Sequence, residues 1–192
     1  MSLSGVGELG HGQVISSTNQ LVGGVMGDRR AEIVQAAFRQ VATVGFEGLR
    51  LREIAADVGI DHSTLHHHFP GKKEIVAGVA EYAIGLTSDA GSAGTLRGYL
   101  AHLASLLERA PEVFVVTAEL DLRARRDPVV REVMARHLAN WRASLRQLFE
   151  VDGSVGDVDG GVELVIAAVK GVQLAPETAG VVFGRLAGLL VG

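Results

Sequence analysis

The stretch RLREIAADVGIDHSTLHHHF, residues 50–69, decides how this chain folds. Its first part predicts a short helix over 51–58, because apolar residues recur there at helical spacing, and a second short helix follows over 62–68. Gly59 permits a tight reversal between the two helices, and Asp61 can accept hydrogen bonds from the free N–H groups that open the second helix. Two short helices joined in this way form the layout of a helix-turn-helix.

The second of these helices carries a polar face. His62 and His66 share one row along it. Ser63 and His67 form the next row, also turned away from the apolar side chains that pack against the first helix. The major groove of DNA admits such a helix, and small or hydrogen-bonding side chains suit base edges and phosphates. The alternative is a surface helix with a polar face inside a helical bundle, and the spacing alone leaves both interpretations open.

Helical periodicity continues through the rest of the chain from residue 28 onward, without convincing strand-like alternation. The four prolines all fall at joints between periodic segments. The predicted fold is therefore all-α, with about nine helices. They are expected over residues 28–45, 51–58, 62–68, 72–90, 95–109, 112–126, 128–150, 159–174 and 177–191, with a polar, glycine-rich loop over 152–161.

Residues 1–27 form a separate segment, predicted to be a flexible leader, because it is glycine-rich and shows no sustained periodicity. It contains a G-x-G-x-x-G pattern over 5–10. That pattern binds a dinucleotide only between a strand and a helix, and the four preceding residues are too few for the strand. No cofactor is predicted.

The bulk composition excludes several classes of protein. The chain has 192 residues, a net charge of −4 and no cysteine, so it lacks disulfides and thiolate metal sites. It has no apolar run long enough to span a membrane and no signal-peptide pattern, which predicts a cytoplasmic protein without membrane contact. No catalytic motif or P-loop is present, so the chain is not expected to be an enzyme.

Several runs resemble the TetR family of transcriptional regulators over about 50 residues with the expected spacing. RRAEIVQAA, residues 29–37, is similar to the family's first helix, and GFEG, residues 45–48, to the turn after it. Residues 52–55 and 58–60 resemble its second helix and turn. The run TLHHHFPGKKE, residues 64–74, resembles the recognition helix and the start of the fourth helix.

This resemblance implies a DNA-binding domain over 28–75 and a ligand-binding and dimerisation domain over 76–192. It further implies a homodimer that binds the two half-sites of a palindromic operator in double-stranded DNA. Such a dimer is expected to act as a repressor, and a small-molecule effector is expected to release it from the DNA. Carried over by position, the DNA-binding residues are Arg50, Arg52, His62, Ser63, Thr64, His66, His67 and Lys72. Among them, Lys72 matches the lysine that meets a phosphate at the start of the fourth helix.

The sequence departs from the family pattern at the DNA-facing positions. Leu49 and Arg50 stand where a Thr and a hydroxyl residue are usual, so Arg50 is expected to replace a phosphate contact with a charge-assisted one. His62 stands for a lysine and His66 for a tyrosine. These histidines lie at i and i+4 and could share an ion. No metal is predicted, because neighbouring histidines diverge on a helix and no Asp, Glu or Cys completes a ligand set on that face.

The last two helices, about 159–191, are expected to pair with their copies in a second chain. Only four charged residues, Glu163, Lys170, Glu177 and Arg185, interrupt the apolar run over 162–191. Such helices carry more apolar surface than one subunit is expected to cover. An ordinary buried helix pair is the alternative.

A ligand cavity is expected in the C-terminal domain, and its apolar wall predicts a largely apolar ligand. The candidate lining residues are Tyr99, Leu103, Phe114, Thr117, Leu120, Trp141 and Leu145, with His102, Glu119, Arg123 and His137 as possible orienting groups. A second set of charges is interpreted as a solvated face: Asp121, Arg123, Arg125, Arg126 and Asp127.

One rival function remains open at this point: a helical small-molecule-binding or dimeric scaffold protein that has lost specific DNA binding. Residues 28–79 carry seven Lys or Arg and seven Asp or Glu, so DNA contact has to come from local placement of charge.

Overall fold

The structure is a computed structural model that describes residues 28–87, 93–153 and 156–190. Within these ranges the fold is all-α, as predicted, with nine α-helices, one 3-10 helix and no strand. The elements are α1 (Asp28–Gly48), α2 (Leu51–Val58), α3 (His62–His68), α4 (Lys72–Thr87), α5 (Leu96–Arg109), α6 (Pro111–Ala124), α7 (Pro128–Val151), α8 (Val158–Leu174), η3 (Pro176–Thr178) and α9 (Ala179–Leu190). The predicted leader, 1–27, lies outside the described residues.

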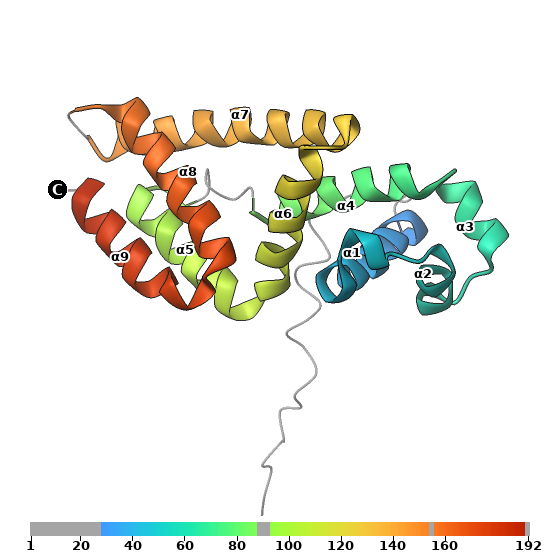
Figure 1. The fold of residues 1–192 in the computed structure, drawn as a ribbon. Coiled ribbons are helices and arrows are strands. Elements are labelled where there is room, and N and C mark those ends of the chain that lie inside the picture. Colours follow the sequence, from blue (N-terminus) through green and yellow to red (C-terminus); the bar gives the residue numbers. More distant parts are fainter. Residues whose placement is uncertain (1–27, 88–92, 154–155, 191–192) are drawn as a thin grey trace, which may run out of the picture.

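The helices form two groups that share a continuous core. α1, α2 and α3 gather at one end of the molecule, and α5, α8 and α9 lie at the other, with α4, α6 and α7 between and above them (Figure 1). α4 packs closely on α1 and on Phe69, the residue that follows α3, through Gly78, where a Cβ atom would stand 2.9 Å from Val34 and 3.6 Å from Phe69. The helix-turn-helix is thus held directly against the helix that leads into the second group.

The structure shifts several predicted boundaries by one or two residues and changes three segments as follows. The first helix does not stop at Gly45: it breaks there, with φ 67° and ψ 175°, and resumes to Gly48. The helix predicted over 159–174 is found as α8 and begins one residue earlier, so the predicted loop over 152–161 ends before Val158; Asp157 caps α8 by accepting a hydrogen bond from the Gly160 N–H at 2.8 Å. The last helix is split into η3 and α9.

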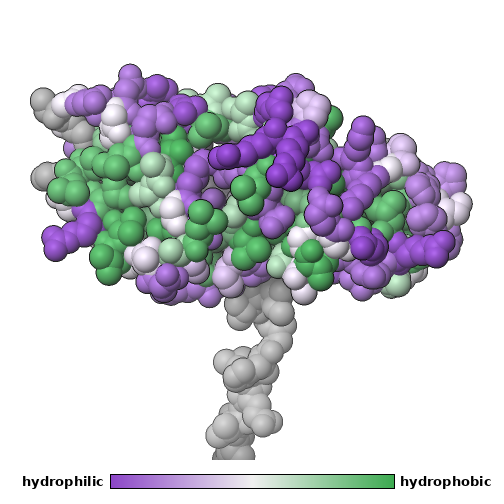
Figure 2. Space-filling view, in the orientation of Figure 1, coloured by the Kyte–Doolittle hydropathy of each residue, from purple (hydrophilic) through white to green (hydrophobic). Residues whose placement is uncertain are grey.

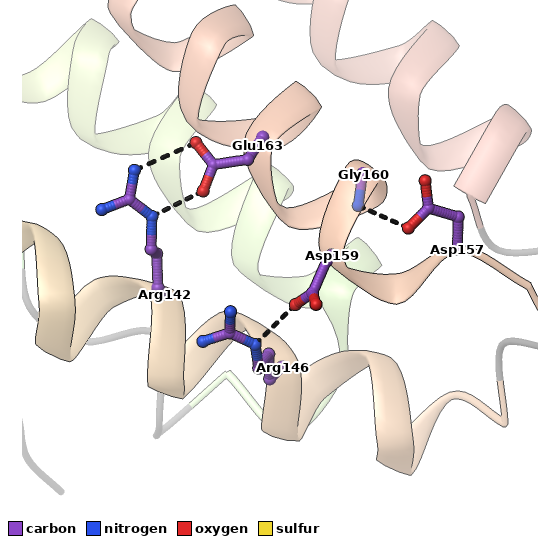
Figure 3. Close-up of polar contacts among 6 residues, drawn as sticks. All are labelled: Arg142, Arg146, Asp157, Asp159, Gly160 and Glu163. Carbon is purple, nitrogen blue, oxygen red and sulfur yellow. Dashed lines mark hydrogen bonds and ion pairs between the residues drawn. The ribbon is translucent and has the colours of Figure 1, made fainter.

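α7 and α8 are joined along one side by ion pairs. Arg142 makes two contacts with the carboxylate of Glu163, at 2.5 and 3.1 Å, and Arg146 meets Asp159 at 2.8 Å (Figure 3). These side chains are mostly exposed, so each pair contributes little to stability. They link two helices that also line the cavity described below.

No helix in the described part of the chain is both long enough and apolar enough to cross a membrane.

Candidate DNA-binding helix and ligand cavity

The turn of the helix-turn-helix has the predicted geometry. Gly59 takes a left-handed conformation, φ 70° and ψ 34°, and its N–H closes the end of α2 on the carbonyls of Ala55 and Ala56. Asp61 caps α3: its carboxylate accepts hydrogen bonds from the Thr64 backbone N–H at 2.8 Å and from the Thr64 hydroxyl at 2.9 Å. These bonds hold the pKa of Asp61 below its ordinary value. The Thr64 hydroxyl is therefore engaged in the cap when DNA is absent.

α3 buries one side and presents the other to solvent. Leu65 and Phe69 have no exposed surface. Four polar side chains of the predicted contact set are exposed on the helix: His62, Ser63, His66 and His67. The structure thus brings these four predicted residues together on one accessible surface.

Two of these histidines contact each other. The Nε2 atoms of His62 and His66 lie 3.0 Å apart, and His66 Nδ1 lies 3.2 Å from the Pro70 carbonyl. A carbonyl only accepts, so neutral His66 donates from Nδ1 and accepts at Nε2 from the Nε2–H of His62. Both ring nitrogens of His66 are engaged in this arrangement, so His62 is the histidine of the pair that keeps a ring nitrogen for other contacts. Across the described residues, no group of three or more His, Cys, Asp or Glu side chains is placed to hold a metal ion.

Two arginines at the start of α1 fasten the ends of both short helices. Arg29 donates a hydrogen bond to the Val58 carbonyl at 3.2 Å, and Arg30 donates one to the His68 carbonyl at 2.5 Å. These carbonyls end α2 and α3, where a positive group also interacts favourably with the helix dipole. Sequence reasoning missed this role, although the adjacent pair RR at 29–30 was the signal that could have indicated it.

The start of α2 compensates for its missing hydroxyl cap through Gln40 of α1. Arg50, the N-cap residue, makes no side-chain cap. Instead, Gln40 Oε1 accepts a hydrogen bond from the Arg50 backbone N–H at 2.6 Å, while Gln40 Nε2 donates to Glu53 at 2.8 Å. The Arg50 guanidinium donates to the carbonyl of Glu47 at 2.8 Å. Arg52 is exposed on α2.

Lys72 lies at the start of α4, close to the other predicted phosphate contacts. Its Nζ donates a hydrogen bond to the Leu49 carbonyl at 3.2 Å. Partial burial lowers the pKa of Lys72; the charges of Arg123 and Arg50 act in the same direction, and Glu47 opposes them. An ammonium group has three donors, so this contact leaves Lys72 able to meet a phosphate as well.

A cavity of about 230 Å³ lies among α4, α5, α6, α7 and α8. Six residues predicted from the sequence line it: Tyr99, Leu103, Phe114, Thr117, His137 and Trp141. The other five predicted residues are placed elsewhere, and two of them, Glu119 and Arg123, line a different hollow beside Phe46 and Asp127. Leu120 and Leu145 belong to the fully buried core, and His102 is half-buried with its Nε2 lacking a hydrogen-bond partner among the described residues.

Polar residues that sequence reasoning missed form one wall of this cavity. Lys170 of α8 contacts both carboxylate oxygens of Asp121 on α6, at 2.6 and 2.5 Å. One turn away, Gln173 donates a hydrogen bond to the Thr117 hydroxyl at 3.0 Å. Arg131 of α7 also lines the cavity. The ligand cavity is therefore less apolar than its predicted stripe suggested.

The interpretation of the charges over 121–127 as a solvated face is wrong for three of its five members. Asp121 turns into the cavity wall. Arg123 and Asp127 form a largely buried ion pair at 3.2 Å, with side chains 24% and 18% exposed. Only Arg125 and Arg126 are exposed as expected. The helical period placed these residues together but did not show which neighbour each would meet.

Aromatic rings form the opposite side of the cavity. His137 stacks on Trp141, with ring centroids 5.8 Å apart and planes inclined by 18°. Burial lowers the pKa of His137, Lys170 lowers it further and Asp121 opposes them, so the ring is neutral at neutral pH. Burial raises the pKa of Tyr99, and a side-chain contact with the Trp141 indole N–H, which points toward the Tyr99 hydroxyl, opposes this shift. That indole N–H is itself buried and lacks hydrogen-bond geometry to any described group.

Comparisons with known proteins agree with this geometry. Residues 33–79 match the family described as bacterial regulatory proteins, tetR family, and residues 88–190 match the tetracyclin repressor-like C-terminal domain. Curated protein sequences give no match.

Solved structures of transcriptional regulators have the same fold. One from Rhodococcus sp. Rha1 is 22% identical, with a TM-score of 0.74 over 84% of this chain and 95% of that chain. One from Haloarcula marismortui is 17% identical, with a TM-score of 0.76 over 86% and 99%. A third, from Saccharomonospora viridis in complex with choline, is 21% identical, with a TM-score of 0.70 over 83% and 93%. At these identities the likeness shows the fold alone.

The fold, the exposed α3 and the family matches define a helix-turn-helix transcriptional regulator of the ligand-responsive kind. The chain belongs to the tetR family.

Proposed function

We propose that this chain is a cytoplasmic repressor that binds a near-palindromic operator as a homodimer and leaves it when a small molecule fills the cavity. The observation that carries the proposal is α3: a short helix, anchored by buried Leu65 and Phe69, whose other face is polar and exposed. A helix presented in this way fits the major groove.

The proposed DNA contacts divide into two kinds. Exposed Ser63, His62 and His67 are assigned to base edges, with His66 supporting His62. Arg50, Arg52 and Lys72 are assigned to phosphates, which position the helix without reading sequence. The Thr64 hydroxyl donates its proton to Asp61, so it offers DNA only an acceptor oxygen, and its main role is to hold the start of α3.

The outward face of α8 and α9 supports the proposed dimer. Hydrophobic side chains gather on the surface over these helices (Figure 2). The most exposed of them are Leu164 (48%), Leu174 (77%), Val181 (72%) and Leu189 (76%). So much exposed apolar surface on two adjacent helices marks an interaction face.

Glycines on the same two helices support close approach of a second copy. An added Cβ at any of four positions would meet nothing within 4 Å inside this chain: Gly171, Gly180, Gly184 and Gly188. Glycine weakens a helix interior, and packing within one chain does not require it here. Close contact with a partner helix would require glycine at these positions.

The cavity supports release by a small molecule. We assign its lining to the effector: Tyr99, Leu103, Phe114, Thr117, His137 and Trp141, together with Asp121, Arg131, Lys170 and Gln173. The structural relative from Saccharomonospora viridis was solved with choline, so a protein of this fold holds a small organic molecule.

Fluorescence anisotropy with labelled DNA flanking the chain's own gene tests the proposal across a salt series. A repressor binds one duplex with two chains, prefers it strongly over scrambled DNA and loses affinity as salt rises. Equal and weak affinity for both duplexes at every salt concentration would contradict DNA recognition and favour a scaffold protein.

A further inference from the structure

We propose that the effector is a small organic acid, bound as its monoanion, which takes Lys170 from Asp121 and so frees α6 from α8. This inference rests on the proposed function, since it names the chemical class of ligand for the same cavity and the contact through which that ligand acts.

The size of the cavity limits the ligand. Its volume of about 230 Å³ lies below the ~300–1,000 Å³ of sites for drug-sized molecules. Aromatic residues Tyr99, Phe114 and Trp141 form much of its wall. A single planar ring or a short chain with one polar end fits this space.

The charges of the wall select the sign of that polar end. Two cations, Lys170 and Arg131, and one anion, Asp121, line the cavity, while His137 is neutral. The wall therefore carries one net positive charge. A buried donor also borders the cavity, because the Trp141 N–H lies near the Tyr99 side chain but forms no well-aligned hydrogen bond with a described group. A carboxylate supplies both the negative charge and the acceptors.

A cationic ligand fits less well. Both carboxylate oxygens of Asp121 are already bound to Lys170, so a cation would have to displace an ammonium group and would add its charge to a wall that is already net positive. A carboxylate instead binds Lys170 and leaves Asp121 free. The Asp121 side chain is 33% exposed, so water can solvate it and no buried charge is stranded.

The same ion pair is placed to influence the DNA-binding end. Asp121 lies on α6, and two other side chains of that helix contact α1. Arg123 stands over the Phe46 ring, 5.1 Å from its centroid, and Glu119 lies against Gly45, 3.5 Å from the position of an added Cβ atom. Because these contacts meet α1 at its break, a shift of α6 reaches the helix whose other end fastens α2 and α3.

Binding is tested on the full chain, without DNA, by fluorescence of its single tryptophan. The probes are benzoate, neutral benzamide and cationic benzylamine, which share a ring and differ in charge. Benzoate is expected to bind at least about tenfold more tightly than either analogue, because only it forms a charge-assisted contact with Lys170. Tighter binding of benzylamine than of benzoate, or equal binding of all three probes, would overturn the inference. This test needs no protein variant.

Two variants locate the acid. Lys170→Met should weaken benzoate at least about tenfold, whereas Asp121→Asn should tighten it, because the competing carboxylate is gone. Glu132→Gln, which breaks an exposed ion pair on α7, is the matched control and should change nothing. Trp141 also borders a second hollow of about 360 Å³, so a benzoate signal that survives in Lys170→Met would place the acid there and contradict the proposal.

Release is measured separately by adding benzoate to the protein–DNA complex. Benzoate should lower the affinity for specific DNA, and Asp121→Asn should need less acid for the same effect. If the protein binds specific DNA, and benzoate binds the protein without releasing that DNA, the contact proposed for release is wrong. The proposed function as a DNA-binding regulator is not contradicted by that result. If the protein binds no specific DNA at all, the proposed function fails, and the fluorescence titration still decides the ligand class.

Discussion

The guanidinium carbon of Arg30 lies 3.9 Å from the centroid of the Phe69 ring, and the same group donates a hydrogen bond to the His68 carbonyl. Arg30 thereby joins the first turn of α1 to the last turn of α3. A helix of seven residues is not stable by itself. The orientation of α3 toward DNA therefore depends on tertiary contacts of this kind.

Arg30→Met tests this fastening. Methionine keeps the apolar stem but loses the charge, the hydrogen bond and the cation–π contact, so the free energy of unfolding should fall by about 1 kcal/mol and DNA affinity should fall with it. Chemical denaturation and anisotropy measure the two effects. Arg39→Met, an exposed arginine of the same helix, is the control for stability. Equal stability of the two variants would show that the contact does not hold α3.

Lys72→Ala should weaken binding to all DNA sequences by a similar factor. A phosphate contact carries no sequence information, and its loss should reduce the slope of log affinity against log salt by about one per subunit. Anisotropy at several salt concentrations, on operator and scrambled DNA, gives both quantities. A changed base preference would show that Lys72 reads a base.

His67→Ala should change the preferred operator and not only the affinity. His67 is exposed on α3, and a direct base contact is worth about 1–3 kcal/mol of discrimination. Selection of bound sequences from a randomised duplex should show relaxed preference at one position in each half-site. Asn or Gln at position 67 should create a new preference there. A uniform small loss at all positions would argue against direct readout.

The helix-turn-helix could be predicted almost residue by residue because its determinants are local. Gly59 provides the left-handed turn and Asp61 the cap, and both lie within a few residues of the atoms they contact. The helices of the C-terminal part were also predictable from their periodicity, with errors of a few residues where a cap or a 3-10 turn decides the end. α8 begins early because of Asp157, for example.

The ligand cavity could be predicted only in part, because its polar wall depends on contacts between distant residues. Asp121 and Lys170 are 49 positions apart, and nothing local distinguishes Asp121 from the charges that follow it. Leu120 and Leu145 share the apolar spacing of the true lining residues, yet both are fully buried in the core. Periodicity identifies an inward face, but it does not locate the empty space.

Gly184→Leu should separate the proposed dimer. In a single chain an added side chain at Gly184 meets nothing, so the monomer should fold, and Gly184→Ala should stabilise α9 by about 0.5–1 kcal/mol. The larger leucine should instead keep a partner helix away. Sedimentation equilibrium measures the dissociation constant. Gly85→Leu, at an equally open helical position on α4, should leave the dimer intact, and an unchanged dimer in Gly184→Leu would place the interface elsewhere.

Acidification should destabilise the protein through His137. Burial lowers the pKa of His137 from its ordinary 6.5, so below that pH the unfolded chain binds a proton that the folded chain binds less readily. The contribution of His137 to stability is therefore complete above pH 6.5. It falls as the pH drops from 6.5 to the folded-state pKa, below which the loss is constant.

Thermal unfolding between about pH 7.5 and about pH 5 measures this loss of stability. His137→Gln, which stays neutral throughout, should show a shallower fall than the natural chain, since every other ionisable group is common to both proteins. Parallel curves would mean that His137 is protonated as easily in the folded cavity as in water. Benzoate should make the difference between the two proteins smaller, because an anion bound beside His137 favours its charged form and raises its pKa.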